Sequence, residues 1–210
     1  MPYSNLAVPE LGSVQVDGLT RQAFILRGAL AVGAVYGAAT IGPFVGQALA
    51  QEKGAGGDVD VLNFALTLEY LETEFYERAL ELTLSPGVRV LARTFGTHER
   101  DHVDALKDTI ASLGGTPVEK PKASFPMGSE RAFLKLAQTL EETGLSAYNG
   151  AAPRIRSPEV LAAAGSIAQI EARHAAAIRE ARGLPPAPRA FDESLEVQQV
   201  LEAVEPFVRS

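Results

Sequence analysis

Four long segments of the chain repeat apolar residues every three or four positions, the spacing that lines one face of an α-helix. The segments span residues 58–84, 88–113, 129–152 and 157–183. Each segment carries a glutamate inside its apolar stripe, and these glutamates are Glu69, Glu99, Glu141 and Glu171. Burying one unpaired carboxylate costs on the order of several kcal/mol, so four of them need a shared counter-charge.

The breaks between these segments indicate how the helices connect. The loops at residues 85–87 and 153–156 are short, which favours two antiparallel helix hairpins. The middle linker, residues 116–128, holds three prolines and no periodicity. Fully extended it reaches about 40 Å, enough to run back along helices of about 20 residues. The sequence predicts an all-α four-helix bundle with a long crossover between the second and third helices, with a compact loop as the alternative.

Beyond the bundle, a shorter helix from Ser194 to about Val208 is expected to close the chain. No β-strand pattern is present. The predicted domains are an N-terminal segment at 1–50, a flexible joint at 51–57, the bundle at 58–183 and a C-terminal extension at 184–210.

Two of the stripe glutamates belong to a repeated Glu-x-x-His pattern, in a chain with only 3 histidines. Residues three apart on a helix share a face, so each glutamate and its histidine point to one place. Two divalent cations would neutralise the four carboxylates, with the Glu-x-x-His glutamates bridging them and each ion adding one histidine and one further glutamate. The predicted metal ligands are Glu69, Glu99, His102, Glu141, Glu171 and His174.

Composition restricts the kind of metal and partner. There is no cysteine, which excludes disulfides and thiolate ligands. Carboxylate and imidazole ligands favour hard or borderline ions, namely iron, manganese or zinc. A net charge of -7 without a basic run argues against nucleic acid as a partner.

Several neighbours of the predicted ligands have two interpretations. Tyr76 follows Glu69 by seven residues and Tyr148 follows Glu141 by seven, which indicates an internal duplication. The two tyrosines are predicted either to hydrogen-bond ligand carboxylates or to fill the core. Two more residues are ambiguous. Glu142 is the rival of Glu141, which is preferred because it shares a face with Gly144. His98 is predicted to be a solvated surface residue, with an outer position around the metal site as the alternative.

The first 50 residues resemble an export signal. Thr20-Arg21-Gln22-Ala23-Phe24 is similar to a twin-arginine signal in which Gln22 replaces the second arginine. An uncharged Ala/Gly-rich run follows and ends in Ala48-Leu49-Ala50, typical of a cleavage site. The expectation is export to the periplasm or cell envelope with cleavage after Ala50. An uncleaved membrane tether and a soluble extension are the alternatives.

The bundle resembles the ferritin-like superfamily, and more closely the exported bacterial ferritin-like proteins related to desiccation-associated proteins. The stretches that carry the resemblance are LNFALTLEYLETEFYERAL, HERDHVDAL, LEETGLSAYNGAAP and SIAQIEARHAAAIR. The resemblance implies a ferritin-like four-helix bundle with a di-metal centre, two iron ions or alternatively manganese. It also implies chemistry with oxygen or peroxide, or iron oxidation and storage. By the same resemblance, Glu72 is similar to an extra carboxylate near the site.

Two functional hypotheses of different classes follow. The first is an exported di-metal protein, with a role linked to oxygen, peroxide or stress and, if it is an enzyme, an oxidoreductase. The second is a metal-independent protective scaffold of the cell envelope that keeps the bundle for packing alone. The sequence leaves open the metal, the reaction and the formation of a homo-oligomer.

Overall fold

The computed structural model describes residues 57–209, so the expected export segment lies outside the described part of the chain. The fold prediction is confirmed: almost all regular structure within these residues is helical. The four long helices are α3 (Asp58–Ala79), α4 (Pro86–Ser112), α5 (Glu130–Ala151) and α6 (Pro158–Ala181). Shorter elements are α7 (Val197–Val204), the 3-10 turns η1 (Ala152–Arg154) and η2 (Glu205–Phe207), and the strands β1 (Lys122–Ala123) and β2 (Val208–Arg209).

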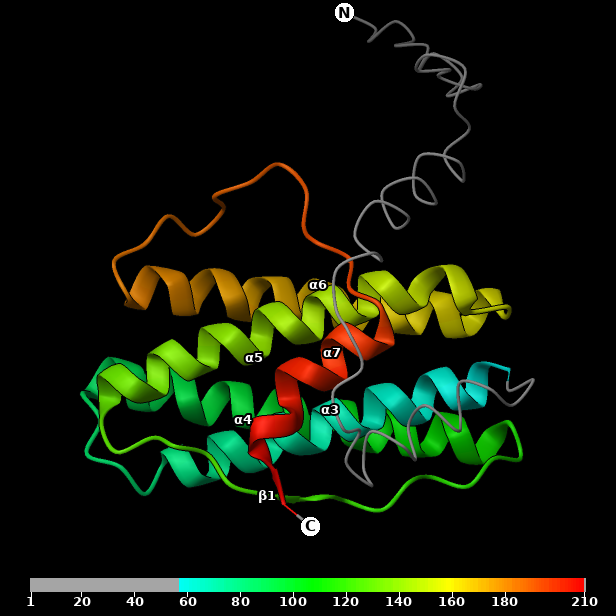
Figure 1. Ribbon diagram of the computed structural model, residues 1–210, viewed down its shortest axis with the longest axis horizontal. Coiled ribbons are helices and arrows are strands. Elements are labelled where there is room, and N and C mark those ends of the chain that lie inside the picture. The colour runs from blue at the N-terminus through cyan, green and yellow to red at the C-terminus, as the bar shows by residue number, and fades with distance from the viewer. Residues whose placement is uncertain (1–56, 210) are drawn as a thin grey trace, which may run out of the picture. The chain divides into compact units, whose positions relative to one another are not determined.

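The long helices pair as two antiparallel hairpins, α3 with α4 and α5 with α6 (Figure 1). Between α4 and α5 the linker runs along the full length of the bundle, the long crossover that the sequence predicts (Figure 1). Asn63 of α3 holds its first part: its Nδ2 donates to the carbonyl of Thr116 over 3.1 Å and its Oδ1 accepts from Val118 N over 2.9 Å.

Helix boundaries follow the local start signals in most places. Ser129 and Ser157 cap α5 and α6 by accepting hydrogen bonds from the backbone N–H three residues ahead. At the start of α3 the cap position is Gly57, and Asp58 does not cap its own helix. Its carboxylate instead accepts from the backbone N–H groups of Arg156 and Ser157, each over 2.7 Å. Asp58 therefore joins the start of α3 to the start of α6.

The C-terminal extension differs from the single helix expected between Ser194 and Val208. Only α7 and the turn η2 are helical, and β2 pairs antiparallel with β1 in the crossover. A two-residue strand carries no periodicity that a sequence pattern could reveal, because only its pairing with a distant segment defines it. Helix α7 packs on α5, and a Cβ at Gly150 would collide with the carbonyl oxygen of Leu195.

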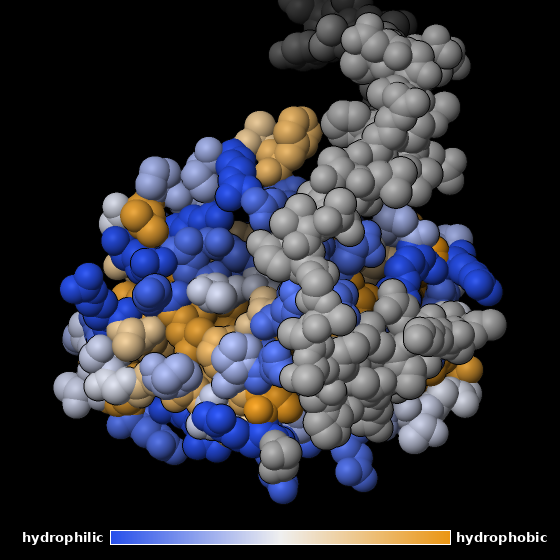
Figure 2. Space-filling view, viewed as in Figure 1, coloured by the Kyte–Doolittle hydropathy of each residue, from blue (hydrophilic) through white to orange (hydrophobic). Residues whose placement is uncertain are grey.

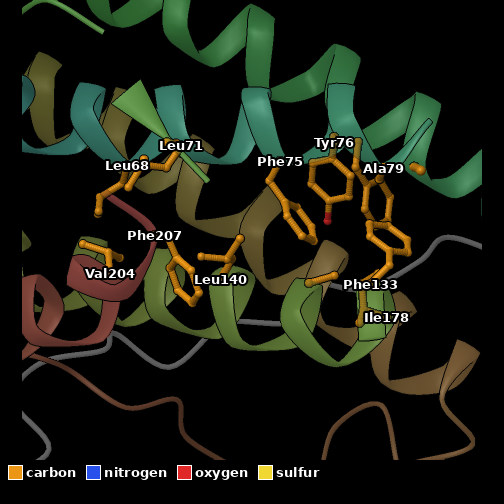
Figure 3. Close-up of a cluster of buried hydrophobic side chains, with 14 of the residues drawn as sticks. Leu68, Leu71, Phe75, Tyr76, Ala79, Phe133, Leu140, Ile178, Val204 and Phe207 are labelled. Carbon is orange, nitrogen blue, oxygen red and sulfur yellow. The ribbon is translucent and has the colours of Figure 1, made fainter. Parts of the chain in front are cut away.

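The core has two apolar layers, one on each side of a polar middle. The first layer contains Phe75, Tyr76, Phe133 and Ile178, with the rings of Phe75 and Phe133 stacked at 5.2 Å between centroids (Figure 3). The second layer gathers apolar residues from the other end of the four helices, including Leu62, Leu66, Leu106, Ile110, Tyr148 and Ile167. Along each long helix, the residues predicted as ligands lie between the two layers.

The outer face of the bundle is mixed. In Figure 2 hydrophilic residues cover much of the visible surface and apolar residues gather mainly near its middle. Within residues 57–209, no helix combines the length and the apolar character needed to cross a bilayer.

Candidate metal centre

All six predicted ligands meet in the polar middle of the bundle. The four glutamates have no exposed surface, while His174 is 2% and His102 is 9% exposed. Their ligand atoms form two groups, and within each group the atoms lie within 4.8 Å of one another. One group consists of Glu69, Glu99, His102 and Glu171, and the other of Glu99, Glu141, Glu171 and His174. Glu99 and Glu171 belong to both groups, as expected of bridging carboxylates.

His102 faces three carboxylates with one ring nitrogen. Its Nδ1 lies 2.9 Å from Glu99 Oε2, 3.2 Å from Glu69 Oε2 and 3.3 Å from Glu171 Oε1. These carboxylates come from α4, α3 and α6, so three helices converge on one imidazole. A cation placed among these atoms would have one nitrogen and three oxygen neighbours.

His174 faces two carboxylates in the same way. Its Nδ1 lies 3.0 Å from Glu99 Oε1 and 3.3 Å from Glu141 Oε2. Phe95 covers the imidazole, with ring centroids 3.9 Å apart and an interplanar angle of 24°. This half of the cluster is therefore closed off from water by an aromatic ring.

Several buried atoms of the cluster have no hydrogen-bond partner among the described residues, although they lie close to one another. They are Glu72 Oε2, Glu99 Oε1, Glu141 Oε2, both oxygens of Glu171 and His174 Nδ1. Leaving buried polar atoms unpaired is costly, and carboxylates gain little from facing each other. Converging nitrogen and oxygen atoms, several of them without a hydrogen-bond partner, fit a pair of divalent cations, whose charge would balance the four carboxylates.

Two tyrosines hold the glutamates that are not in a Glu-x-x-His pattern. Tyr148 of α5 donates a 2.6 Å hydrogen bond to Glu69 of α3. Conversely, Tyr76 of α3 donates to Glu141 of α5. Each tyrosine hydroxyl of α3 or α5 thus donates to a glutamate on the other of these two helices. One oxygen of each carboxylate remains for another ligand or ion. The Glu/Tyr pattern that is repeated in the sequence therefore corresponds to two reciprocal hydrogen bonds between α3 and α5.

Glu72 adds a further buried carboxylate beside the two groups. It is 3% exposed, and its Oε2 has no partner among the described residues. Gly144 of α5 makes room for it: a Cβ at this glycine would lie 3.0 Å from Glu72 Oε1 and 3.3 Å from Glu171 Oε2. The glycine on the ligand face of α5 therefore allows two acidic side chains to approach the helix backbone.

Glu142 and His98 lie at different distances from the cluster. Glu142 lies outside the cluster, where its Oε1 accepts a 2.9 Å hydrogen bond from Arg179 Nε, so Glu141 is the glutamate that α5 brings to the centre. The prediction that His98 is a solvated surface residue is wrong. His98 is half-buried, and its Nδ1 lies 2.9 Å from Nε2 of His174. Only the packing of α4 against α6 produces this contact.

The carboxylates strongly influence the two histidines. Burial lowers the pKa of His102, but Glu171, Glu69 and Glu99 outweigh it and raise the pKa to about 12. Burial likewise lowers the pKa of His174, whereas Glu141 and Glu99 raise it to about 9. Without metal ions, both imidazoles are therefore cations that balance part of the negative charge.

Burial also acts on the carboxylates themselves. It raises the pKa of Glu99 to about 7, although His102 and His174 oppose the shift. The pKa values of Glu171 and Glu72 rise well above the ordinary value because of burial and then of the neighbouring glutamates. Such a cluster holds protons when no ion is present, so an ion that binds there must displace them.

Comparisons with known proteins agree with this architecture. The model of the ferritin-like domain family matches residues 57–184. A solved structure of a conserved hypothetical protein from Mycobacterium tuberculosis is similar with a TM-score of 0.56 and 22% sequence identity, over 64% of this chain and 96% of that one. At this identity the likeness concerns the fold alone. A search of the curated proteins found no match. Because the family match covers more than half of the sequence and contains the whole buried Glu/His cluster, the chain belongs to the ferritin-like domain family.

Proposed function

We propose that the protein binds two metal ions in the bundle, with iron as the first candidate and manganese as the alternative. The observation that carries this proposal is the sharing of Glu99 and Glu171 between two groups of converging ligand atoms. Each group adds one histidine nitrogen and one further glutamate, so the two positions have matching ligand sets. Nitrogen and carboxylate ligands of this kind suit both metals.

The surrounding residues would orient the ligands and keep water away. Tyr76 and Tyr148 fix the carboxylates of Glu141 and Glu69, and Phe95 covers His174. Two adjacent redox-active ions supply reactivity toward oxygen or peroxide when they are bound, and a buried site protects such reactivity from side reactions. We therefore propose that the protein handles oxygen or peroxide, with the stress-protective role as the wider hypothesis from the sequence.

Metal content and thermal stability test this proposal. Purified protein from metal-replete cells is expected to hold about two ions per chain. Its melting temperature should decrease when a chelator removes them. At a free metal concentration 1,000 times Kd, one bound ion stabilises the fold by about 4 kcal/mol.

The matched control is the double variant His102→Ala with His174→Ala, which is expected to hold no ions and to show no response to chelator. Wild-type protein that contains no metal and melts at the same temperature with and without chelator would contradict the proposal. That result would favour the metal-independent scaffold instead.

We also propose, from the sequence of residues 1–50, that the protein is exported and cleaved after Ala50. Cell fractionation with sequencing of the mature N-terminus tests this proposal. The expected mature chain starts at Gln51 outside the cytoplasm. A full-length chain confined to the cytoplasm would refute export, and a full-length chain in the membrane fraction would identify a tether.

A further inference from the structure

His98 contacts the far side of one predicted ligand. Its Nδ1 lies 2.9 Å from Nε2 of His174, and the two rings are nearly parallel, with an interplanar angle of 11° and centroids 5.2 Å apart. His98 lies on α4 directly before Glu99, whereas His174 lies on α6. The contact therefore links the two Glu-x-x-His helices outside the cluster of carboxylates.

The other half of the centre lacks this support. By the duplication, the residue before Glu171 is the counterpart of His98, and it is Ile170, whose side chain can neither donate nor accept a hydrogen bond. Among the described residues, His102 uses Nδ1 for its contacts with carboxylates, and its Nε2 has no protein partner. Phe95 repeats the asymmetry, because it stacks on His174 while its counterpart on α6 is Ile167.

The hydrogen bond selects one form of the His174 ring. Nδ1 of His174 faces the carboxylates, at 3.0 Å from Glu99, so this nitrogen must be free of its proton to bind an ion. The ring proton then lies on Nε2 and is donated to Nδ1 of His98.

We propose that His98 is a positioning residue for His174, and that it makes the two metal positions unequal. The position built from Glu99, Glu141, Glu171 and His174 binds its ion more tightly than the position that contains His102. This inference rests on the proposed di-metal function. The physical reason is that a hydrogen bond on the outer nitrogen fixes both the tautomer and the orientation of a ligating imidazole.

Calorimetric titration of metal-free protein with Mn²⁺ or, without oxygen, Fe²⁺ tests the inference. Wild-type protein is expected to bind in two distinguishable steps. His98→Leu removes the acceptor but keeps an apolar side chain, and it is expected to weaken the tighter step by about 10- to 100-fold. The weaker step should keep its affinity.

Two control variants separate positioning from packing. His98→Asn offers an amide oxygen near the place of Nδ1 and is expected to restore the tighter step to within a few-fold of wild type. Ile170→Leu changes the counterpart position and should leave both steps unchanged. Nitrogen-15 NMR of metal-free protein gives a second readout, because the Nε2 proton of His174 should be protected from exchange in wild type and His98→Asn but not in His98→Leu.

The outcomes distinguish this inference from the proposed function. Wild-type protein that binds no ions refutes both. Wild-type protein that binds two ions, with His98→Leu binding them equally well, refutes only the positioning role. Loss of both steps in His98→Leu together with a lower melting temperature of the metal-free protein would mean that His98 acts on the fold, and would also overturn the inference.

Discussion

The hairpin of α3 and α4 and the hairpin of α5 and α6 bring the same predicted ligands to the buried Glu/His cluster from equivalent positions. Each contributes one glutamate with a tyrosine seven residues later, and one Glu-x-x-His pair. The halves differ beside these ligands. Glu72 of α3 corresponds to Gly144 of α5, and His98 of α4 corresponds to Ile170 of α6.

This difference separates the residues that would bind the ions from the residues that would modify the properties of the site. The repeated residues are the six whose atoms converge in the two groups and the two tyrosines that hydrogen-bond to them, and each group draws on both hairpins. The unequal residues lie around that set. Glu72 occupies space that any side chain at Gly144 would need, and His98 supports only His174. We therefore expect equivalent substitutions of the predicted ligands to act alike in the two halves, and substitutions of Glu72 or His98 to act on one half only.

The largest expected effect comes from removing a shared carboxylate. Because Glu99 and Glu171 each belong to both groups, Glu99→Ala or Glu171→Ala should weaken binding of both ions by at least about 100-fold, or about 2.7 kcal/mol. Glu69→Ala and Glu141→Ala should each affect mainly one ion. Metal stoichiometry and calorimetry measure this, and a bridging variant that still binds one ion at wild-type affinity would contradict the shared role.

The next effect concerns the pH dependence of the metal-free protein. His102, His174 and Glu99 have folded-state pKa values of about 12, 9 and 7, all above the ordinary values of 6.5 for histidine and 4.5 for glutamate. The folded state therefore holds more protons than the unfolded state between about pH 5 and 9. Each extra proton removes about 1.4 kcal/mol of stability per pH unit as the pH rises through that range.

Chemical denaturation at pH 6 and pH 9 measures this loss, with double His→Ala protein as the control. NMR titration then compares the halves: His174 should lose its proton near pH 9, while His102, which faces three carboxylates, should stay protonated to higher pH. Metal-free protein that becomes more stable as the pH rises from 6 to 9 would refute the raised pKa values of these groups in the folded state.

A smaller effect tests the relation between Glu72 and Gly144. Gly144→Ala would put a methyl group 3.0 Å from Glu72 Oε1, so the carboxylate must shift at a cost of about 1 kcal/mol. In a Glu72→Ala background the same change should cost much less. A double-mutant cycle by denaturant unfolding measures the coupling, and a cycle with additive effects would show that the two positions do not share space.

Much of the centre could be predicted because helical periodicity fixes which residues share a face. That periodicity selects Glu141 over Glu142, since Glu141 is in line with Gly144 and Tyr148, and the structure places Glu142 on Arg179 instead. The same reasoning failed for His98. Its position relative to its own helix predicts a solvent-exposed side chain, and nothing in α4 indicates that His174 of another helix lies within 2.9 Å.

For the same reason, the sequence did not predict the strand pair of β1 and β2 or the hydrogen bonds of Asp58. Each depends on a partner far along the chain, and neither has a local repeat.

By itself the sequence determined the four helices and, on their inner faces, the glutamates and the two Glu-x-x-His histidines. These features are local, because apolar periodicity and turn residues act over a few positions. Only the tertiary structure decided which oxygen faces which nitrogen, which tyrosine holds which glutamate, and that His98 contacts His174. Such contacts depend on the rotation and register of packed helices, which are set by the whole core.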